Sequence, residues 1–203
     1  MLVMLELVIF LATVVLLIMV LRKLPLEKEV VKKLAYDARE QADEEADEVD
    51  DGSEDLLNKA DHLAQAGEYS KAERIYLKLV MEDPQNAGLY NKLALVYLGK
   101  KEFKDAAKAL TQALTIEPDN DTFYNNLGLL LYQQEHYDEA IESYEKSIAI
   151  NNKVASRFMN LGLAYFMVKK YRKAADAYEK ALILEPNNEE YKRLLTEAEE
   201  KSK

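Results

Sequence analysis

Residues 155–188 decide the fold, and they read ASRFMNLGLAYFMVKKYRKAADAYEKALILEPNN. Apolar residues return every three or four positions on both sides of a polar break at Lys169 and Lys170. This period predicts two amphipathic helices joined by a tight turn. Pro186 cannot continue the second helix and marks its end. Two such short helices cannot bury their apolar faces alone, so the pair must stack on a neighbour.

The same pattern occurs three more times upstream, at a fixed step of 34 residues. A small residue recurs in each first helix, an aromatic residue opens each second helix, and an alanine follows three positions later. These columns are Ala60, Ala94, Gly128 and Gly162; Tyr69, Phe103, Tyr137 and Tyr171; and Ala72, Ala106, Ala140 and Ala174. Four copies in phase predict a solenoid of stacked helix pairs. The predicted repeats are 53–86, 87–120, 121–154 and 155–188, followed by a capping helix at 189–203.

These columns resemble the tetratricopeptide repeat (TPR) family. The first helix of that family has, in order, a large residue, a Leu, a Gly or Ala, and a Tyr. Its second helix has an aromatic residue and Ala, and a Pro follows it. The first copy departs from this pattern at Lys59, and the third at Ser147 and Asn152. The fourth copy shows the pattern most fully, at Phe158, Leu161, Gly162, Tyr165, Tyr171, Ala174, Tyr178, Ala181 and Pro186. The resemblance implies an all-α, right-handed superhelical TPR solenoid whose first helices line a concave groove.

Residues 1–22 form an apolar run that predicts a single transmembrane helix. Glu6 is the only charged side chain before Arg22, and about twenty apolar residues span a ~30 Å hydrocarbon core. A cleaved signal peptide fits less well, because no basic residue precedes the run and no A-x-A site follows it. All nearby Lys and Arg follow the run, so the positive-inside rule predicts a single-pass protein of the cell (inner) membrane with its N-terminus outside and its repeats in the cytoplasm.

Two further segments separate this run from the repeats. Residues 23–41 place Leu26, Val30 and Leu34 at helical spacing and predict an amphipathic stalk helix, which serves as a spacer, a self-association seam or a strip on the membrane. Residues 42–52 predict a solvated acidic linker, since nine of the thirteen residues from Asp43 to Asp55 are Asp or Glu. A calcium loop is excluded there, because Val49 and Asn58 occupy two of its ligand positions.

Catalysis is not expected. The chain has no Cys and only two His, His62 and His136, and neither His lies in a known nucleophilic or metal-binding motif. A formal net charge of −10 argues against a nucleic-acid partner. The sequence therefore predicts no catalytic residue, no metal and no cofactor, which leaves binding as the function class.

The resemblance also implies which residues face the groove, namely fixed positions on each first helix. The candidate groove residues of this chain are Asn91, Leu95, Leu98, Asn125, Asn126, Leu129, Tyr132, Gln133, Met159, Asn160, Leu163, Phe166 and Met167. Asparagine amides both donate and accept, so they suit an extended peptide backbone, whereas the apolar members suit an amphipathic helix. A third reading is that part of the row belongs to the core.

One well-known TPR subgroup binds a C-terminal carboxylate with Lys and Asn in the first helix of one repeat and basic groups two repeats later. Here the corresponding positions hold Leu57 and Asp61, then Asn125 and Leu129. An acidic C-terminal tail is therefore not the expected ligand.

Taken with the membrane run, these features predict a membrane-anchored, non-catalytic adaptor. Its groove would bind a protein or peptide partner from the cytoplasm and recruit it to the membrane, with the N-terminal helix in contact with lipid. Two alternatives stay open. The first is a self-assembling scaffold, a homo-oligomer on the membrane. The second is an assembly factor for envelope biogenesis.

Overall fold

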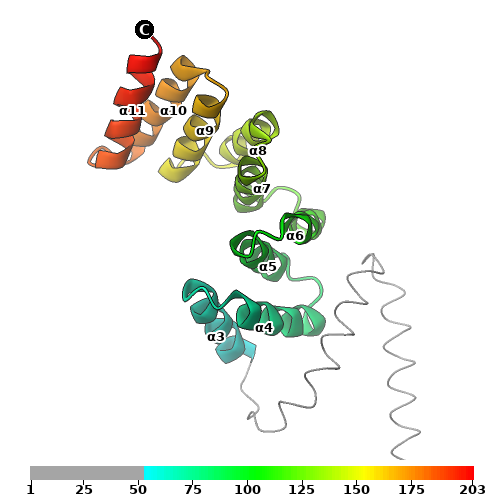
Figure 1. Cartoon of the computed structure of the whole chain (residues 1–203). Coiled ribbons are helices and arrows are strands. Elements are labelled where there is room, and N and C mark those ends of the chain that lie inside the picture. The colour runs from blue at the N-terminus through cyan, green and yellow to red at the C-terminus, as the bar shows by residue number, and fades with distance from the viewer. Residues whose placement is uncertain (1–52) are drawn as a thin grey trace, which may run out of the picture. The chain divides into compact units, whose positions relative to one another are not determined.

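The computed structural model describes residues 53–203, and the predicted transmembrane helix (1–22), stalk (23–41) and acidic linker (42–52) lie outside them (Figure 1). The described residues form helices and no strands. The helices are α3 (Ser53–Gln65), α4 (Tyr69–Glu82), α5 (Ala87–Gly99), α6 (Phe103–Ile116), α7 (Asp121–Gln133), α8 (Tyr137–Ile150), α9 (Ala155–Met167), α10 (Tyr171–Leu184) and α11 (Glu189–Lys201). Within this part of the chain, no helix has the length and hydropathy required to cross a membrane.

Each helix packs against the next one along the chain, and the pairs stack in sequence order from α3 to α11 (Figure 1). Each predicted repeat contains one pair, and α11 is the unpaired last helix. The all-α solenoid expected from the 34-residue period is therefore confirmed in residues 53–203.

The turn inside each pair has the same backbone conformation at the same step of 34. Gly67, Lys101, Glu135 and Lys169 have φ angles of 79°, 61°, 64° and 60°. The residue after each of them donates its N–H to a carbonyl near the end of the first helix, for example Glu102 N to Tyr97 O at 2.8 Å and His136 N to Leu131 O at 2.9 Å. This is a Schellman cap, which satisfies carbonyls that a helix end leaves free. Only the first of the four turns uses glycine, the residue that adopts positive φ without strain.

An asparagine caps the N-terminus of two first helices and of the last helix. The side chains of Asn86, Asn120 and Asn188 accept backbone N–H groups at the starts of α5, α7 and α11. Proline two residues earlier ends the preceding helix, so the short Pro-x-Asn motif both stops one helix and begins the next. At the start of α9 the cap position holds Val154, which has no side-chain hydrogen bond.

A buried polar cluster occupies this uncapped junction and accounts for the departure of the third repeat at Ser147. The Ser147 hydroxyl donates to the backbone carbonyl of Asp121 at 2.7 Å, and buried Arg157 forms an ion pair with the Asp121 carboxylate. Asn151 joins them, because its side-chain amide donates to Asp121 at 3.1 Å and its carbonyl accepts from Arg157 at 3.2 Å. The junction between α7, α8 and α9 is thus polar at Ser147, where the first, second and fourth repeats have Leu79, Ala113 and Ala181.

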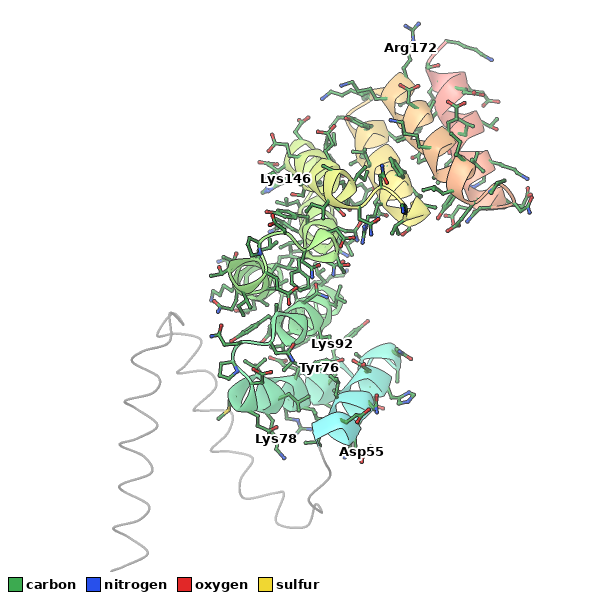
Figure 2. All side chains as sticks on the ribbon, turned by 180° about the vertical axis from the view of Figure 1, so that it is seen from behind. Asp55, Tyr76, Lys78, Lys92, Lys146 and Arg172 are labelled. Atoms are coloured by element: carbon green, nitrogen blue, oxygen red, sulfur yellow. The ribbon has the colours of Figure 1, made fainter. Side chains whose placement is uncertain are left out.

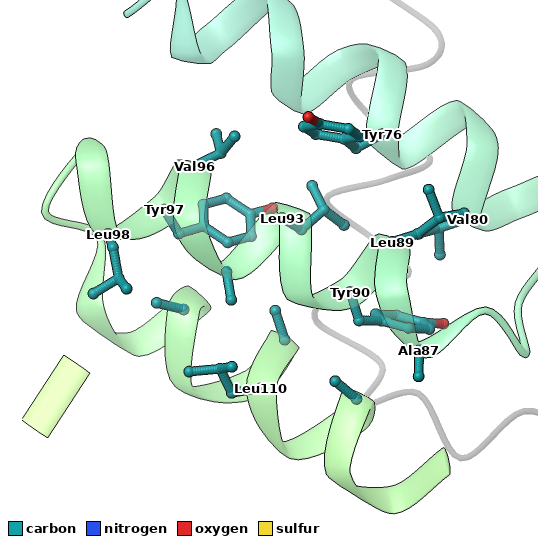
Figure 3. Packing of buried hydrophobic residues seen from close by; sticks show 14 of the residues in the cluster. Tyr76, Val80, Ala87, Leu89, Tyr90, Leu93, Val96, Tyr97, Leu98 and Leu110 are labelled. Atoms are coloured by element: carbon teal, nitrogen blue, oxygen red, sulfur yellow. The ribbon is translucent and has the colours of Figure 1, made fainter. Parts of the chain in front are cut away.

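Small residues allow the two helices of each pair to approach closely. The columns led by Ala60 and Ala72 are buried throughout, and Figure 3 shows the side chains of α5 between Tyr76 of α4 and Leu110 of α6. In the third and fourth repeats the first-helix column is glycine. A Cβ atom added there would lie 2.6 Å from the Tyr144 ring at Gly128 and 2.4 Å from the Tyr178 ring at Gly162.

We predict that Gly162→Ala lowers the free energy of unfolding by about 1–3 kcal/mol, because the Tyr178 ring is fully buried and cannot move aside. Urea unfolding of a chain that starts at residue 53 measures the change. Combining Gly162→Ala with Tyr178→Leu should cost less than the sum of the single losses, since repeat 2 pairs Ala94 with Leu110 at these positions. Simple additivity of the two losses would contradict the assigned contact.

We also predict that Glu135→Gly raises the free energy of unfolding by about 0.5–1 kcal/mol. Positive φ strains a residue that has a side chain, by about 1–2 kcal/mol, and the greater freedom of glycine in the unfolded chain offsets part of this gain. Gly67→Ala serves as the reverse test and should lose about 1 kcal/mol. If both variants move the urea midpoint in the same direction, the turn geometry is not what sets their stability.

Candidate functional site

The four candidate asparagines join three first helices through one chain of hydrogen bonds. Asn160 of α9 donates to Asn125 of α7 at 3.1 Å, Asn125 donates to Asn126 at 3.3 Å, and Asn126 donates to Asn91 of α5 at 2.7 Å. We call these four residues the asparagine ladder. Each contact between repeats joins residues 35 positions apart, one more than the repeat.

The members of the ladder differ in exposure. Asn126 is only 7% exposed, whereas Asn91, Asn125 and Asn160 are half-buried. Without Asn91 and Asn125 the buried amide of Asn126 would lack hydrogen-bond partners, and an unsatisfied buried polar group costs about 1–3 kcal/mol. The ladder therefore stabilises the stacking of α5, α7 and α9 whether or not a ligand is present.

An apolar row runs beside the ladder, with one leucine from each of the same helices. Leu95 is 42% exposed, Leu129 and Leu163 are half-buried, and Met167 at the end of α9 is 44% exposed. Tyr132, Met159 and Phe166 are also half-buried, and Gln133 is exposed. These residues stay accessible in part, as a contact surface requires.

Leu98 is the exception, because it is 5% exposed and belongs to the apolar core. Its counterparts in the next repeats, Tyr132 and Phe166, are longer and pack edge-on against Tyr137 and Tyr171, with ring centroids 5.3 and 5.1 Å apart. The shorter leucine does not extend beyond its neighbours to the surface. Assigning Leu98 to the groove was therefore wrong, and Asn126 acts mainly within the ladder.

Charged groups lie at the two ends of this row and not along it. In the first repeat Asp61, which corresponds to Leu95, accepts from Lys92 at 2.7 Å and from the Tyr76 hydroxyl at 2.5 Å. Although burial opposes the effect, these hydrogen bonds hold the pKa of Asp61 below its ordinary value. On α11, Arg193 and Glu197 correspond to Asn125 and Leu129, and they form an ion pair at 3.6 Å.

The sequence contained a signal for the ladder that the repeat pattern alone did not reveal. Asn125 and Asn126 are adjacent, which allows α7 to reach both neighbouring first helices from consecutive positions. The ion pair of Asp61 and Lys92 joins residues 31 positions apart, so it too crosses between repeats. These contacts join residues 31 or 35 positions apart, and neither separation equals the 34-residue repeat, so the repeat pattern does not reveal them.

A separate pocket of about 350 Å³ opens on another side of α9, between α8 and α10. Its floor is Phe158, Leu161 and Tyr165, and none of the candidate groove residues lines it. The Tyr165 hydroxyl donates to Glu145 at 2.5 Å, and burial together with this bond raises the pKa of Tyr165 to about 12. Among residues 53–203 no cluster of three or more His, Asp or Glu side chains is arranged to hold a metal ion.

Comparison with known proteins identifies the repeats. Family models described as tetratricopeptide repeat match residues 91–155 and 155–188. A comparison with curated protein sequences gave no significant match.

Several solved structures share the fold. A crystal structure of MamA protein is 25% identical, with a TM-score of 0.64, over 74% of this chain and 82% of that chain. The pilF protein of Pseudomonas aeruginosa is 26% identical, with a TM-score of 0.68, over 74% and 68% of the two chains. The first TPR of Spaghetti (RPAP3), bound to the HSP90 peptide SRMEEVD, is 23% identical, with a TM-score of 0.55, over 58% of this chain and 94% of that one. Residues 53–203 thus form an all-helical solenoid with the fold of these structures, and the tetratricopeptide repeat models match its residues 91–188.

Proposed function

We propose that this chain is a non-catalytic protein-interaction module that recruits a cytoplasmic partner to the membrane. The groove would bind a segment of the partner, and the apolar residues 1–22 would anchor the module in the lipid. The observation that carries the first part is the apolar row, because Leu95, Leu129, Leu163 and Met167 remain partly exposed across three consecutive repeats.

An exposed row of this kind is costly in water unless something covers it. Large apolar patches on soluble surfaces mark interaction sites, and burying apolar area contributes about 25 cal/mol per Å². The fold itself is suited to the task, since the first TPR of Spaghetti (RPAP3) holds the peptide SRMEEVD. That ligand is acidic, whereas the groove of this chain has no basic residue among its candidate members, so a different ligand is expected here.

The membrane part of the proposal rests on the sequence of residues 1–22 and on the basic residues that follow them. Arg22 is the last residue of the run, Lys23, Lys28, Lys32 and Lys33 follow it, and no Lys or Arg lies at its other end. The positive-inside rule then favours an outside N-terminus and cytoplasmic repeats. The adaptor is preferred to a self-assembling scaffold because the exposed row does not require a second copy to explain it.

We predict that Leu129→Asp abolishes most partner capture from solubilised membranes, because a carboxylate in the centre of the row would be buried without a partner. Quantitative mass spectrometry of affinity-purified full-length protein measures the change, which we expect to be at least about ten-fold. Ile183→Asp is the matched control, since Ile183 is 71% exposed and lies on α10, outside the candidate row. Equal losses from both variants would refute the groove, and recovery of only the chain itself would favour the scaffold.

We also predict that protease added to intact cells, or to right-side-out vesicles, leaves residues 53–203 undigested until the membrane is opened with detergent. A tag placed after Lys203 reports the fragment on a blot. Deleting residues 1–22 should release the protein from the membrane fraction. Digestion of the repeats without detergent would reverse the proposed orientation, and membrane retention of the truncated chain would remove the anchor from the proposal.

A further inference from the structure

We infer that the occupant of the groove is an amphipathic helix with an uncharged face, lying across α5, α7 and α9. This inference rests on the proposed function and specifies the class of partner that the same site takes. Three features of the described residues support it: the pairing of the amides, the spacing of the apolar row and the distribution of charge.

The amides that could bind an extended backbone are already paired with one another. Asn125 accepts from Asn160 and donates to Asn126, and Asn126 is buried. Within the ladder only the Asn91 nitrogen and the Asn160 oxygen make no hydrogen bond to another member. Each amide keeps one further N–H or oxygen lone pair, but the ladder fixes the direction in which these groups point, so a peptide strand would have to fit an orientation that is already set. The asparagine ladder therefore does not favour a ligand that binds through its main chain.

The apolar row has one leucine per repeat, so the distance between adjacent first helices sets its spacing. Leu95, Leu129 and Leu163 supply one leucine from each repeat, and α5 and α7, like α7 and α9, are in contact. Helices in contact lie about 8–10 Å apart, and a helix presents residues i and i+7 on one face about 10.5 Å apart. A strand presents residues on one face every ~6.6 Å, which does not match one contact per repeat.

The charged residues around the apolar row indicate which parts of the bound helix can carry charge. No candidate groove residue is charged, so a charge on the buried face of the ligand would lose its water without gaining a partner. Lys92 of α5, labelled in Figure 2, pairs with Asp61 at one end of the row, and the ion pair Arg193–Glu197 lies on α11, beyond the other end. Three contacts one helical heptad apart require a helix of about 15 residues or more, with polar residues confined to its outer face and ends.

Two peptide probes of about 18 residues and identical composition test this inference. One carries leucine at every third or fourth position, which forms a single apolar face on a helix, and the other carries the same number of leucines at alternate positions in its central part, as in a strand. Fluorescence polarisation with the full chain in neutral lipid nanodiscs measures both affinities. We expect the helical probe to bind at least about ten-fold more tightly than the alternating probe.

Variants of the full chain separate the two modes of binding. Leu129→Asp, or Leu163→Ser if the first variant fails to fold by circular dichroism, should weaken the helical probe about ten-fold or more, and Ile183→Asp should not. Asn125→Ala, measured where circular dichroism shows it folded, should change the affinity less than about three-fold. Tighter binding of the alternating probe, or a ten-fold loss of affinity from Asn125→Ala, would contradict a helical occupant. Neither result would contradict the proposed interaction module. Failure of both probes would also overturn the helix, whereas the proposed function fails if Leu129→Asp leaves partner capture unchanged or if Ile183→Asp reduces it equally.

Discussion

The whole solenoid depends on how closely two helices can approach at one point in each pair. At that point the first helix offers Ala or Gly and the second helix inserts a large side chain, as when the Tyr178 ring meets the backbone of Gly162. Close packing of this kind leaves no room for an extra methyl group, and it sets the distance between the helices of a pair. The position of every groove residue follows from that distance, because the first helices of successive repeats are held in place by the second helices behind them.

Much of this architecture could be predicted from the sequence because it repeats. The three columns of small, aromatic and alanine residues recur every 34 positions, so each column tests the others, and the helices occur where the pattern places them. The turns were predicted by position but not by mechanism. Lys101, Glu135 and Lys169 adopt a conformation that a single sequence would assign to glycine, and the Schellman hydrogen bonds impose it on them.

The candidate site was less predictable for a physical reason. Repeat position determines which helix face a residue occupies, but exposure depends on the length of the side chain and of its neighbours. Leu98 and Tyr132 share a position, yet only the longer residue remains accessible. The asparagines were expected to be available to a ligand, and their pairing across repeats became apparent only from the distances between α5, α7 and α9. Residues 1–52 and everything inferred from them stay predictions.

The polar cluster between α7, α8 and α9 has a consequence for the modularity of the chain. Solenoid repeats are often treated as exchangeable units, but here the fourth repeat carries Arg157, whose charge is met by groups that only the third repeat provides. The positions corresponding to Asp121 and Ser147 in the second repeat hold Ala87 and Ala113. Joining the fourth repeat directly to the second would take the Asp121 carboxylate away from the buried Arg157, and breaking a buried ion pair costs about 3–5 kcal/mol. Glu117, which corresponds to Asn151, would be the acidic residue of the second repeat next to this junction. The order of the repeats is thus partly encoded in the interfaces between them.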